Sequence, residues 1–450
     1  MQDLTSGSLS RHLLKTSSFM LVSMIFQTMY VLVDLFWVSR LGTEAVAAVA
    51  VSGNLMFAVL AATQMLGVGT TTMVSHAVGA KDHARAQLVF NQAQVLSLGV
   101  GILFLALAMA LRLPYANGLS ADTATATLAA DYLLWFIPAM AMQFGLVAMG
   151  AALRGTGAFK PGMIVQIMTV VLNMILAPIL MFGWGPAPEL GVAGTAIASL
   201  LAILVGVVWM LLFFKPASSY LTFDRALWAP RTDLWKQLLK IGLPTGGEFA
   251  LLAIYMAVIY AVSRPFGPAA QAGFGIGGRI MQALFMPAVA LGFAVAPVAG
   301  QNYGARLGDR VRRTFNVAAL MAGGTMLVVT LLVFFGGSGL MRLFSQDPEV
   351  IAVGEEYLQI VSLTFVLSGV IFVSSSMFQA LGNSVPPLLT SLVRNVAVIG
   401  PVLALSRLPG FALVWMWYIA AGSTVLHITM NLLLLRRDFG KRLAFTVTPT

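Results

Sequence analysis

Apolar residues fill twelve long stretches of the chain, and polar residues gather in the shorter segments between them. An α-helix needs about 20 predominantly apolar residues to cross a bilayer. The pattern therefore predicts spans at 16–38, 45–74, 87–111, 126–151, 161–183, 191–214, 241–263, 268–298, 314–336, 352–379, 387–406 and 411–435. We expect an all-α integral membrane protein with about twelve transmembrane helices.

The composition supports this class and removes several others. Hydrophobic residues make up 59% of the chain and charged residues only 9%, whereas soluble domains carry roughly 25% charged residues. The chain has no cysteine and four scattered histidines, which excludes thiolate metal sites and cysteine nucleophiles. It shows no nucleophile–base–acid constellation and no glycine-rich phosphate loop with a Lys-Ser/Thr ending. We therefore expect neither an enzyme nor an ATP-driven pump, and no cofactor.

The basic residues lie unevenly on the two sides of the predicted spans. Nineteen Lys and Arg residues fall on the side of the N-terminus and five on the other side. The positive-inside rule makes the first side cytoplasmic, so both termini lie inside and the number of spans is even. This placement accounts for the net charge of +10 without a nucleic-acid partner. We expect the plasma (inner) membrane.

An internal repeat divides the chain. Leu13-Leu14-Lys15 recurs as Leu238-Leu239-Lys240, and Gly79-Ala80-Lys81 recurs as Gly304-Ala305-Arg306, both at an offset of 225 residues. Repeated halves with an even number of spans have the same orientation, an arrangement common in secondary transporters. We predict two pseudo-symmetric six-helix lobes, 1–215 and 237–450, joined by a polar cytoplasmic linker at 216–236.

Asp34 is one of two acids that lie deep inside predicted spans. An ionisable residue at such a depth is costly and usually functional. Phe26, Tyr30 and Trp37 stand at helical spacings from Asp34, and an aromatic face with one carboxylate suits a lipophilic cation. The alternative is an interfacial residue that extends outward near Arg40.

Glu248 is the second deep acid. It follows Gly242-Leu243-Pro244-Thr245-Gly246-Gly247, and such a loosened helix can admit water or ligand. We place Glu248, Tyr255 and Gln282 among the candidate substrate-binding residues. The alternative is a packing role for Glu248 beside Lys240 or Gln282.

Two arginines and one histidine also lie within predicted spans. Arg279 and Arg394 are the two basic ones, and they are either counter-ions for the deep acids or structural residues; we favour the structural reading. We interpret His427, in the last span, as a hydrogen-bonded structural histidine.

Six short motifs carry a family resemblance. They are Val33-Asp34-Leu35-Phe36-Trp37-Val38, Val78-Gly79-Ala80-Lys81, Ala152-Leu153-Arg154-Gly155-Thr156-Gly157, Gly275-Ile276-Gly277-Gly278-Arg279-Ile280, Gly300-Gln301-Asn302-Tyr303-Gly304-Ala305 and Phe378-Gln379-Ala380-Leu381-Gly382-Asn383. Together they resemble the multidrug and toxic compound extrusion (MATE) antiporters of the MOP flippase superfamily over nearly the whole chain.

The resemblance implies a V-shaped cavity between two lobes and alternating access. It also implies exchange of inward H⁺ or Na⁺ for outward small cationic, amphipathic compounds, by a monomer in lipid. Asp34 matches the family's first-helix aspartate, and Asn173 and Thr195 match its polar partners on helices five and six. Glu248 matches a helix-seven glutamate of one bacterial branch.

Three positions depart from the family pattern. Ala177 stands where one branch has a second aspartate, Val370 where another has a helix-ten aspartate, and Phe19 where a first-helix proline bends some members. Na⁺ needs a cage of several oxygens, of which Asp34, Asn173 and Thr195 would form part. Because Ala177 supplies no anionic ligand, H⁺ is the favoured coupling ion.

Two other functions stay open at this point. One is a lipid-linked saccharide flippase of the same superfamily, which would favour extra spans and a cationic cavity for pyrophosphate. The other is a membrane protein that transports nothing.

Overall fold

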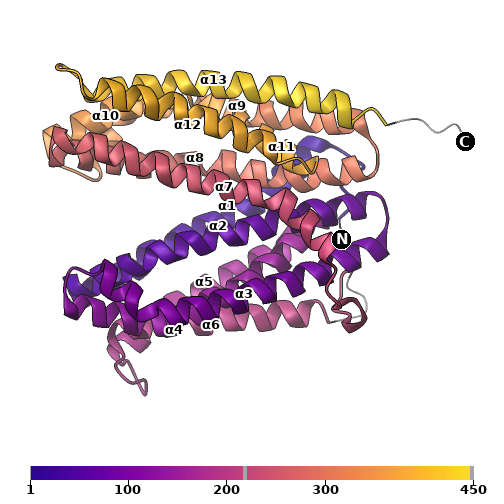
Figure 1. The fold of residues 1–450 in the computed structure, drawn as a ribbon, viewed down its shortest axis with the longest axis horizontal. Helices are drawn as coiled ribbons and strands as arrows, with labels where there is room; N and C mark the ends of the chain where they lie inside the picture. Colours follow the sequence, from indigo (N-terminus) through magenta and orange to yellow (C-terminus); the bar gives the residue numbers. More distant parts are fainter. Residues whose placement is uncertain (1, 216–219, 446–450) are drawn as a thin grey trace, which may run out of the picture. The chain divides into compact units, whose positions relative to one another are not determined.

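The computed structural model describes residues 2–215 and 220–445. These residues form thirteen α-helices, three short 3₁₀ helices and no strand (Figure 1). The α-helices are α1 (Leu9–Val38), α2 (Thr43–Gly79), α3 (His83–Leu119), α4 (Thr123–Gly155), α5 (Phe159–Phe182), α6 (Gly191–Phe213), α7 (Thr232–Ser263), α8 (Pro268–Gly304), α9 (Gly308–Arg342), α10 (Pro348–Ser362), α11 (Phe365–Ala380), α12 (Val385–Leu405) and α13 (Leu413–Arg442). The 3₁₀ helices are η1 (Ser39–Leu41), η2 (Arg225–Leu227) and η3 (Arg264–Phe266).

Eleven of the described helices are long and apolar enough to cross a membrane, and α10 with α11 makes a twelfth span. The prediction of an all-α membrane protein with about twelve spans is confirmed. The prediction of one continuous helix over 352–379 is wrong, because α10 and α11 meet at an angle of 56°.

Hydroxyl side chains donate to backbone carbonyls at this break. The Thr330 hydroxyl of α9 donates to the Ser362 carbonyl at 2.8 Å, and the Thr364 hydroxyl donates to the Val361 carbonyl at 2.7 Å. Carbonyls that lose their helical donors inside a membrane need such substitutes. Leu363 lies at the break, whereas its repeat position, Pro138, lies inside the unbroken α4. Hydropathy could not reveal a break that has no proline or glycine.

The chain divides into two compact units. Unit 1 contains Phe19–Leu243 and the described residues through Asp3, and unit 2 contains Leu4–Ser18 and the described residues from Pro244 onward. The sequence assigned Leu4–Ser18 to the N-terminal lobe. The structure groups them with unit 2, where the Leu4 backbone N–H donates to Gln301 Oε1 at 3.0 Å.

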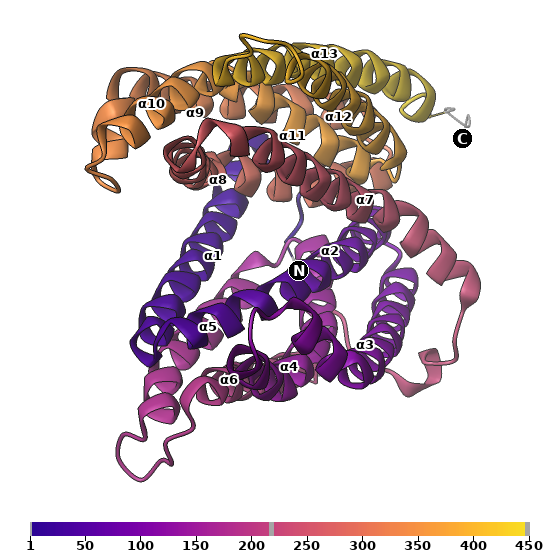
Figure 2. The same ribbon diagram turned by 60° about the vertical axis from the view of Figure 1, so that its left-hand side comes forward.

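The same pattern of helix neighbours occurs in each unit. In unit 1, α4 packs against α2, α3, α5 and α6; in unit 2, the α10–α11 pair packs against α8, α9, α12 and α13. The pairs α2–α3 and α5–α6 recur as α8–α9 and α12–α13 (Figures 1 and 2). The sequence repeat therefore corresponds to a repeated packing arrangement.

The turns after α2 and α8 show the repeat in backbone detail. Lys81 and Arg306 both adopt left-handed conformations, with φ of 57° and 58°. Their backbone N–H groups donate to the Val78 and Tyr303 carbonyls, each at 3.0 Å. Left-handed backbone is uncommon for residues other than glycine, so its recurrence after 225 residues reflects a duplicated turn.

The described part of the linker lies against α3. Gln87, Asn91 and Gln92 accept hydrogen bonds from the backbone N–H groups of Thr222, Asp224 and Arg231, at 3.0, 2.9 and 2.9 Å. These amide side chains supply the partners that a segment without regular structure needs. The predicted linker residues 216–219 lie outside the described residues.

Candidate functional site

Asp34 stands on α1 in unit 1. Its Oδ1 atom is buried and has no hydrogen-bond partner among the described residues. The one salt bridge in the described parts of the chain joins Arg442 to Asp438. Arg40 instead lies over the rings of Phe36 and Trp37, at 4.7 and 5.3 Å from their centroids. Asp34 is therefore not neutralised by Arg40.

A short hydrogen-bond network stands beside Asp34. The Tyr30 hydroxyl, one helical turn before Asp34, lies 3.2 Å from Ser199 Oγ on α6. Asn173 Nδ2 on α5 donates to the same Ser199 oxygen at 2.9 Å. The structure thus joins the predicted residues Tyr30 and Asn173 through Ser199. The sequence reading missed Ser199, whose only signal is a small polar side chain one turn after Thr195.

Two more oxygens of this region are buried. Asn173 Oδ1 has no hydrogen bond among the described residues, and Thr195 Oγ1 lies beside the Tyr132 hydroxyl. An unpaired buried polar atom costs about 1–3 kcal/mol. Oxygen donors suit a proton or a hard cation such as Na⁺. Asp34, Asn173 and Thr195 therefore fit a small cation chemically.

Tyr132 on α4 completes this part of unit 1. It is only 3% exposed and lies near Asp34 and Tyr30. The sequence reading missed Tyr132, because an apolar span hides a single tyrosine. Ala177 is also buried on α5, one turn after Asn173, so this position supplies no oxygen.

The other aromatic candidates of α1 have different surroundings. Trp37 packs edge-on against Phe182 and Trp184, with ring centroids 6.0 and 5.7 Å apart. Phe26 is half-buried one turn before Tyr30. Gln27, the residue after Phe26, accepts a hydrogen bond at its Oε1 from Gln166 Nε2 of α5 at 2.6 Å. The predicted aromatic face of α1 thus divides into Tyr30 beside Ser199 and Trp37 within an aromatic cluster.

Glu248 stands on α7 in unit 2, four residues after Pro244. Its Oε1 atom is buried and lacks a hydrogen-bond partner among the described residues. Gln282 is exposed on α8, so it does not bind that oxygen. Asp34 and Glu248 are thus both deep carboxylates with an unpartnered oxygen, each in its own unit.

Arg394 and Tyr255 lie together in unit 2. The guanidinium carbon of Arg394 lies 5.3 Å from the centroid of the Tyr255 ring. Arg279 is exposed on α8. His427 is buried, and its Nε2 has no partner among the described residues, so the hydrogen bond expected for a structural histidine is missing at that atom.

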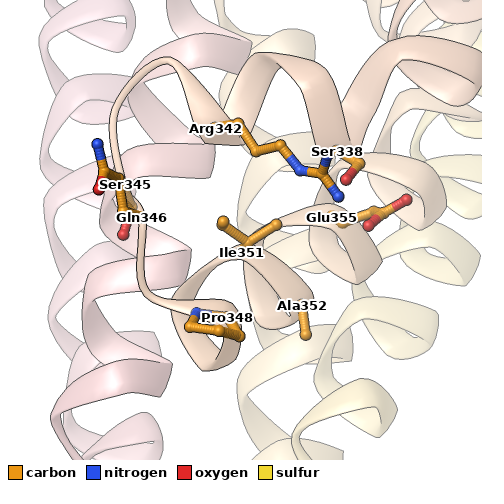
Figure 3. Close-up of a pocket in the computed structure, with 8 residues that line it drawn as sticks. All are labelled: Ser338, Arg342, Ser345, Gln346, Pro348, Ile351, Ala352 and Glu355. Carbon is orange, nitrogen blue, oxygen red and sulfur yellow. The ribbon is translucent and has the colours of Figure 1, made fainter.

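A separate pocket of about 530 Å³ lies in unit 2 at the turn between α9 and α10. Figure 3 shows the Arg342 side chain extending toward Ser338 and Glu355. The other lining residues are Ser345, Gln346, Pro348, Ile351 and Ala352. The pocket shares no residue with the regions of Asp34 or Glu248.

Comparison with known proteins points to one family. The MatE family model matches residues 20–179 and again residues 244–405, which repeats the internal duplication. The chain is similar to the probable multidrug resistance protein YoeA of Bacillus subtilis (strain 168), with 26% identity over 390 residues that cover 85% of this chain and 84% of the relative. It is also similar to the FAD transporter of Shewanella oneidensis, with 26% identity over 413 residues and 89% coverage of both chains.

A solved structure has the same fold. It is described as the outward-facing conformation of a multidrug resistance MATE family transporter of the MOP superfamily. The TM-score is 0.90 at 23% sequence identity, and the alignment covers 98% of each chain. At this identity the likeness concerns the fold.

Proposed function

Because this chain belongs to the MatE family, we propose that it exports cationic amphipathic compounds in exchange for protons by alternating access. Its family and its fold make it a membrane transporter rather than an enzyme. The observation that carries the finer proposal is the buried Asp34 Oδ1 atom, which has no partner and lies in the region of Tyr30 and Tyr132.

Competition at one carboxylate would couple the two fluxes. Asp34 binds either a proton or the cationic group of a substrate, since a protonated carboxyl no longer attracts the cation. The Tyr30 and Tyr132 rings add favourable faces for a lipophilic cation. Asn173 on α5 and Thr195 on α6 would supply further oxygens.

A proton is the favoured coupling ion, with Na⁺ at Asp34, Asn173 and Thr195 as the alternative. Protonation needs one carboxylate, whereas a Na⁺ cage needs several oxygens and gains none from Ala177. The driving force suffices, because one pH unit is worth about 1.4 kcal/mol. Exchange of one proton for a monovalent cation is electroneutral, so each pH unit sustains a substrate gradient of about tenfold.

Glu248 provides the corresponding acid in unit 2. We assign it to substrate binding, with Tyr255 and Gln282 as further candidates. Glu248, with its unpartnered oxygen, follows Pro244 by four residues on α7. The glycines and the proline before it weaken the helix at this point. Such a helix can expose a buried acid to water or ligand.

The protein purified into proteoliposomes tests the proposal. Efflux of ethidium is measured under an imposed pH gradient without Na⁺, and under a Na⁺ gradient at constant pH. We expect the pH gradient to drive efflux, and Asp34→Asn to abolish it in a folded protein. Asp131→Asn is the matched control, because Asp131 is an exposed acid on α4 of the same unit. Transport that needs Na⁺ and ignores the pH gradient would overturn the proton assignment but not Asp34.

An anionic cargo is the second candidate, because one relative carries the name FAD transporter. The same proteoliposomes, loaded with FAD in place of ethidium, test it. The flippase alternative is tested by movement of a fluorescent lipid-linked saccharide between leaflets. Flipping without ethidium efflux would favour it.

The proposed setting is a monomer in the plasma (inner) membrane with both termini in the cytoplasm. The support is the excess of basic residues on one side of the alternating spans.

A further inference from the structure

Two tyrosines occupy the same repeat positions in the two units. Tyr30 of α1 corresponds to Tyr255 of α7, and Tyr132 of α4 corresponds to Tyr357 of α10, each at the offset of 225 residues. Within each unit the two tyrosines lie near each other. Each unit therefore holds a pair of tyrosines on corresponding helices.

The charge beside this pair has opposite signs in the two units. In unit 1 the acid is Asp34, and its repeat position in unit 2 is the buried, uncharged Ile259. In unit 2 the charge against the tyrosine pair is Arg394, whose repeat position in unit 1 is Thr169. The acid of unit 2, Glu248, lies two helical turns before Tyr255 on α7. The Arg394 guanidinium lies 5.3 Å from the Tyr255 ring centroid and near Tyr357.

Arg394 has no carboxylate partner in the described parts of the chain, where the one salt bridge joins Arg442 to Asp438. Arg394 is half-buried on α12. The nearby His427 is buried, and its Nε2 has no partner there. A half-buried cation without an anion has lost part of its hydration, and a bound anion would offset that loss.

Further aromatic rings pack against Tyr357. Tyr357 packs edge-on against Phe274 and Trp417, with centroids 5.3 and 4.8 Å apart. Trp417 Nε1 can only donate a hydrogen bond, and it is buried without a partner among the described residues. The region thus offers positive charge, hydrogen-bond donors and ring faces.

We propose that unit 2 contains an anion-binding subsite, centred on Arg394 with Tyr255 and Tyr357, that takes the carboxylate or phosphate of an aromatic organic anion. The planar guanidinium binds such oxyanions with two parallel hydrogen bonds, and the tyrosine rings pack against the aromatic body. The subsite extends the substrate class from cations to aromatic anions and rests on the proposed transport function for its use in export.

Binding of flavin mononucleotide and riboflavin to the purified full-length protein tests the subsite. The two probes share the ring system and differ by one phosphate. We expect flavin mononucleotide to bind at least about tenfold more tightly than riboflavin, since a hydrogen bond to a charged group is worth about 1.5–3 kcal/mol. Competition by 2-naphthoate, followed by fluorescence, tells whether a carboxylate occupies the same place.

Two substitutions locate the effect. Arg394→Gln should bring the affinity for flavin mononucleotide to that for riboflavin, while riboflavin binding changes less than about twofold. Arg279→Gln is the matched control, because it removes an exposed arginine of the same unit. Equal loss in both variants would mean general attraction by positive charge and would overturn the subsite.

Two further measurements keep the proposal falsifiable if Arg394→Gln does not fold. Arg394→Lys keeps the charge but loses the two-pronged geometry, and should weaken flavin mononucleotide binding. In the wild type, equal affinities for the two flavins would by themselves overturn the subsite. Binding is measured without a gradient, so equal affinities for the two flavins would leave the proposed role of Asp34 in transport standing. Conversely, a failure of ethidium efflux would not change the ratio of the two flavin affinities.

Discussion

The Tyr30 hydroxyl of α1 lies 3.2 Å from Ser199 Oγ of α6, and Ser199 also accepts a hydrogen bond from Asn173. The residues in this contact come from three helices of unit 1. It places Tyr30 one helical turn from a carboxylate whose Oδ1 is buried and unpartnered.

Ser199→Ala should weaken both stability and transport. The substitution leaves the Asn173 amide and the Tyr30 hydroxyl without their shared partner, at a cost of about 1–3 kcal/mol. Thermal unfolding in detergent and ethidium efflux measure the two effects. A double-mutant cycle with Tyr30→Phe should give non-additive changes, and Ser39→Ala, which alters an exposed serine of the same unit, is the control. Additive changes would show that the contact does not couple the residues.

Glu248→Gln should slow export of a cationic dye in a folded protein. The amide keeps the shape of the side chain and removes the charge that we assign to substrate binding. Efflux from proteoliposomes under pH and Na⁺ gradients is the measurement. Glu356→Gln, an exposed acid on α10 of the same unit, serves as the control. Parental rates under every gradient would make Glu248 a packing residue.

Single-cysteine labelling should show the proposed orientation. The chain has no native cysteine, so Arg225→Cys in η2 and Asp347→Cys between α9 and α10 each introduce the sole thiol. We expect an impermeant maleimide to label position 347, and not position 225, from outside intact cells. The opposite pattern would reverse the topology.

Thr330→Val should destabilise the junction of α10 and α11. It removes the hydroxyl that donates to the Ser362 carbonyl at 2.8 Å and leaves a buried acceptor unpaired, at about 1–3 kcal/mol. The melting temperature should be lower than that of Thr429→Val, which alters an exposed threonine on α13. Equal melting temperatures would mean that another group replaces the hydroxyl.

Gly242→Ala should be costly, because a Cβ at this position would meet the backbone carbonyl of Met65 on α2. Backbone cannot move aside as a flexible side chain can, so we expect a loss of about 1–3 kcal/mol. Gly278→Ala is the control, since nothing lies within 4 Å of its Cβ position and alanine favours helix. A melting temperature as high as that of the control would contradict the close approach of α7 to α2.

The amino-acid sequence by itself determined the class of the protein, the number of spans and the duplication. Long apolar stretches have one stable solution in lipid, because every backbone group must be paired within a helix. The repeat was visible because its turns need particular residues, such as those around Lys81 and Arg306. Asp34 and Glu248 were visible because a carboxylate stands out in an apolar span.

The tertiary structure alone decided which residues surround those acids and where helices break. Ser199 and Tyr132 lie 165 and 98 residues from Asp34, and no local pattern links positions so far apart. Hydropathy treats a threonine hydroxyl as nearly neutral, although Thr330 satisfies the carbonyl freed between α10 and α11. The sign of the charge beside each tyrosine pair also depends on packing, because Asp34 and Arg394 come from helices that do not correspond in the repeat.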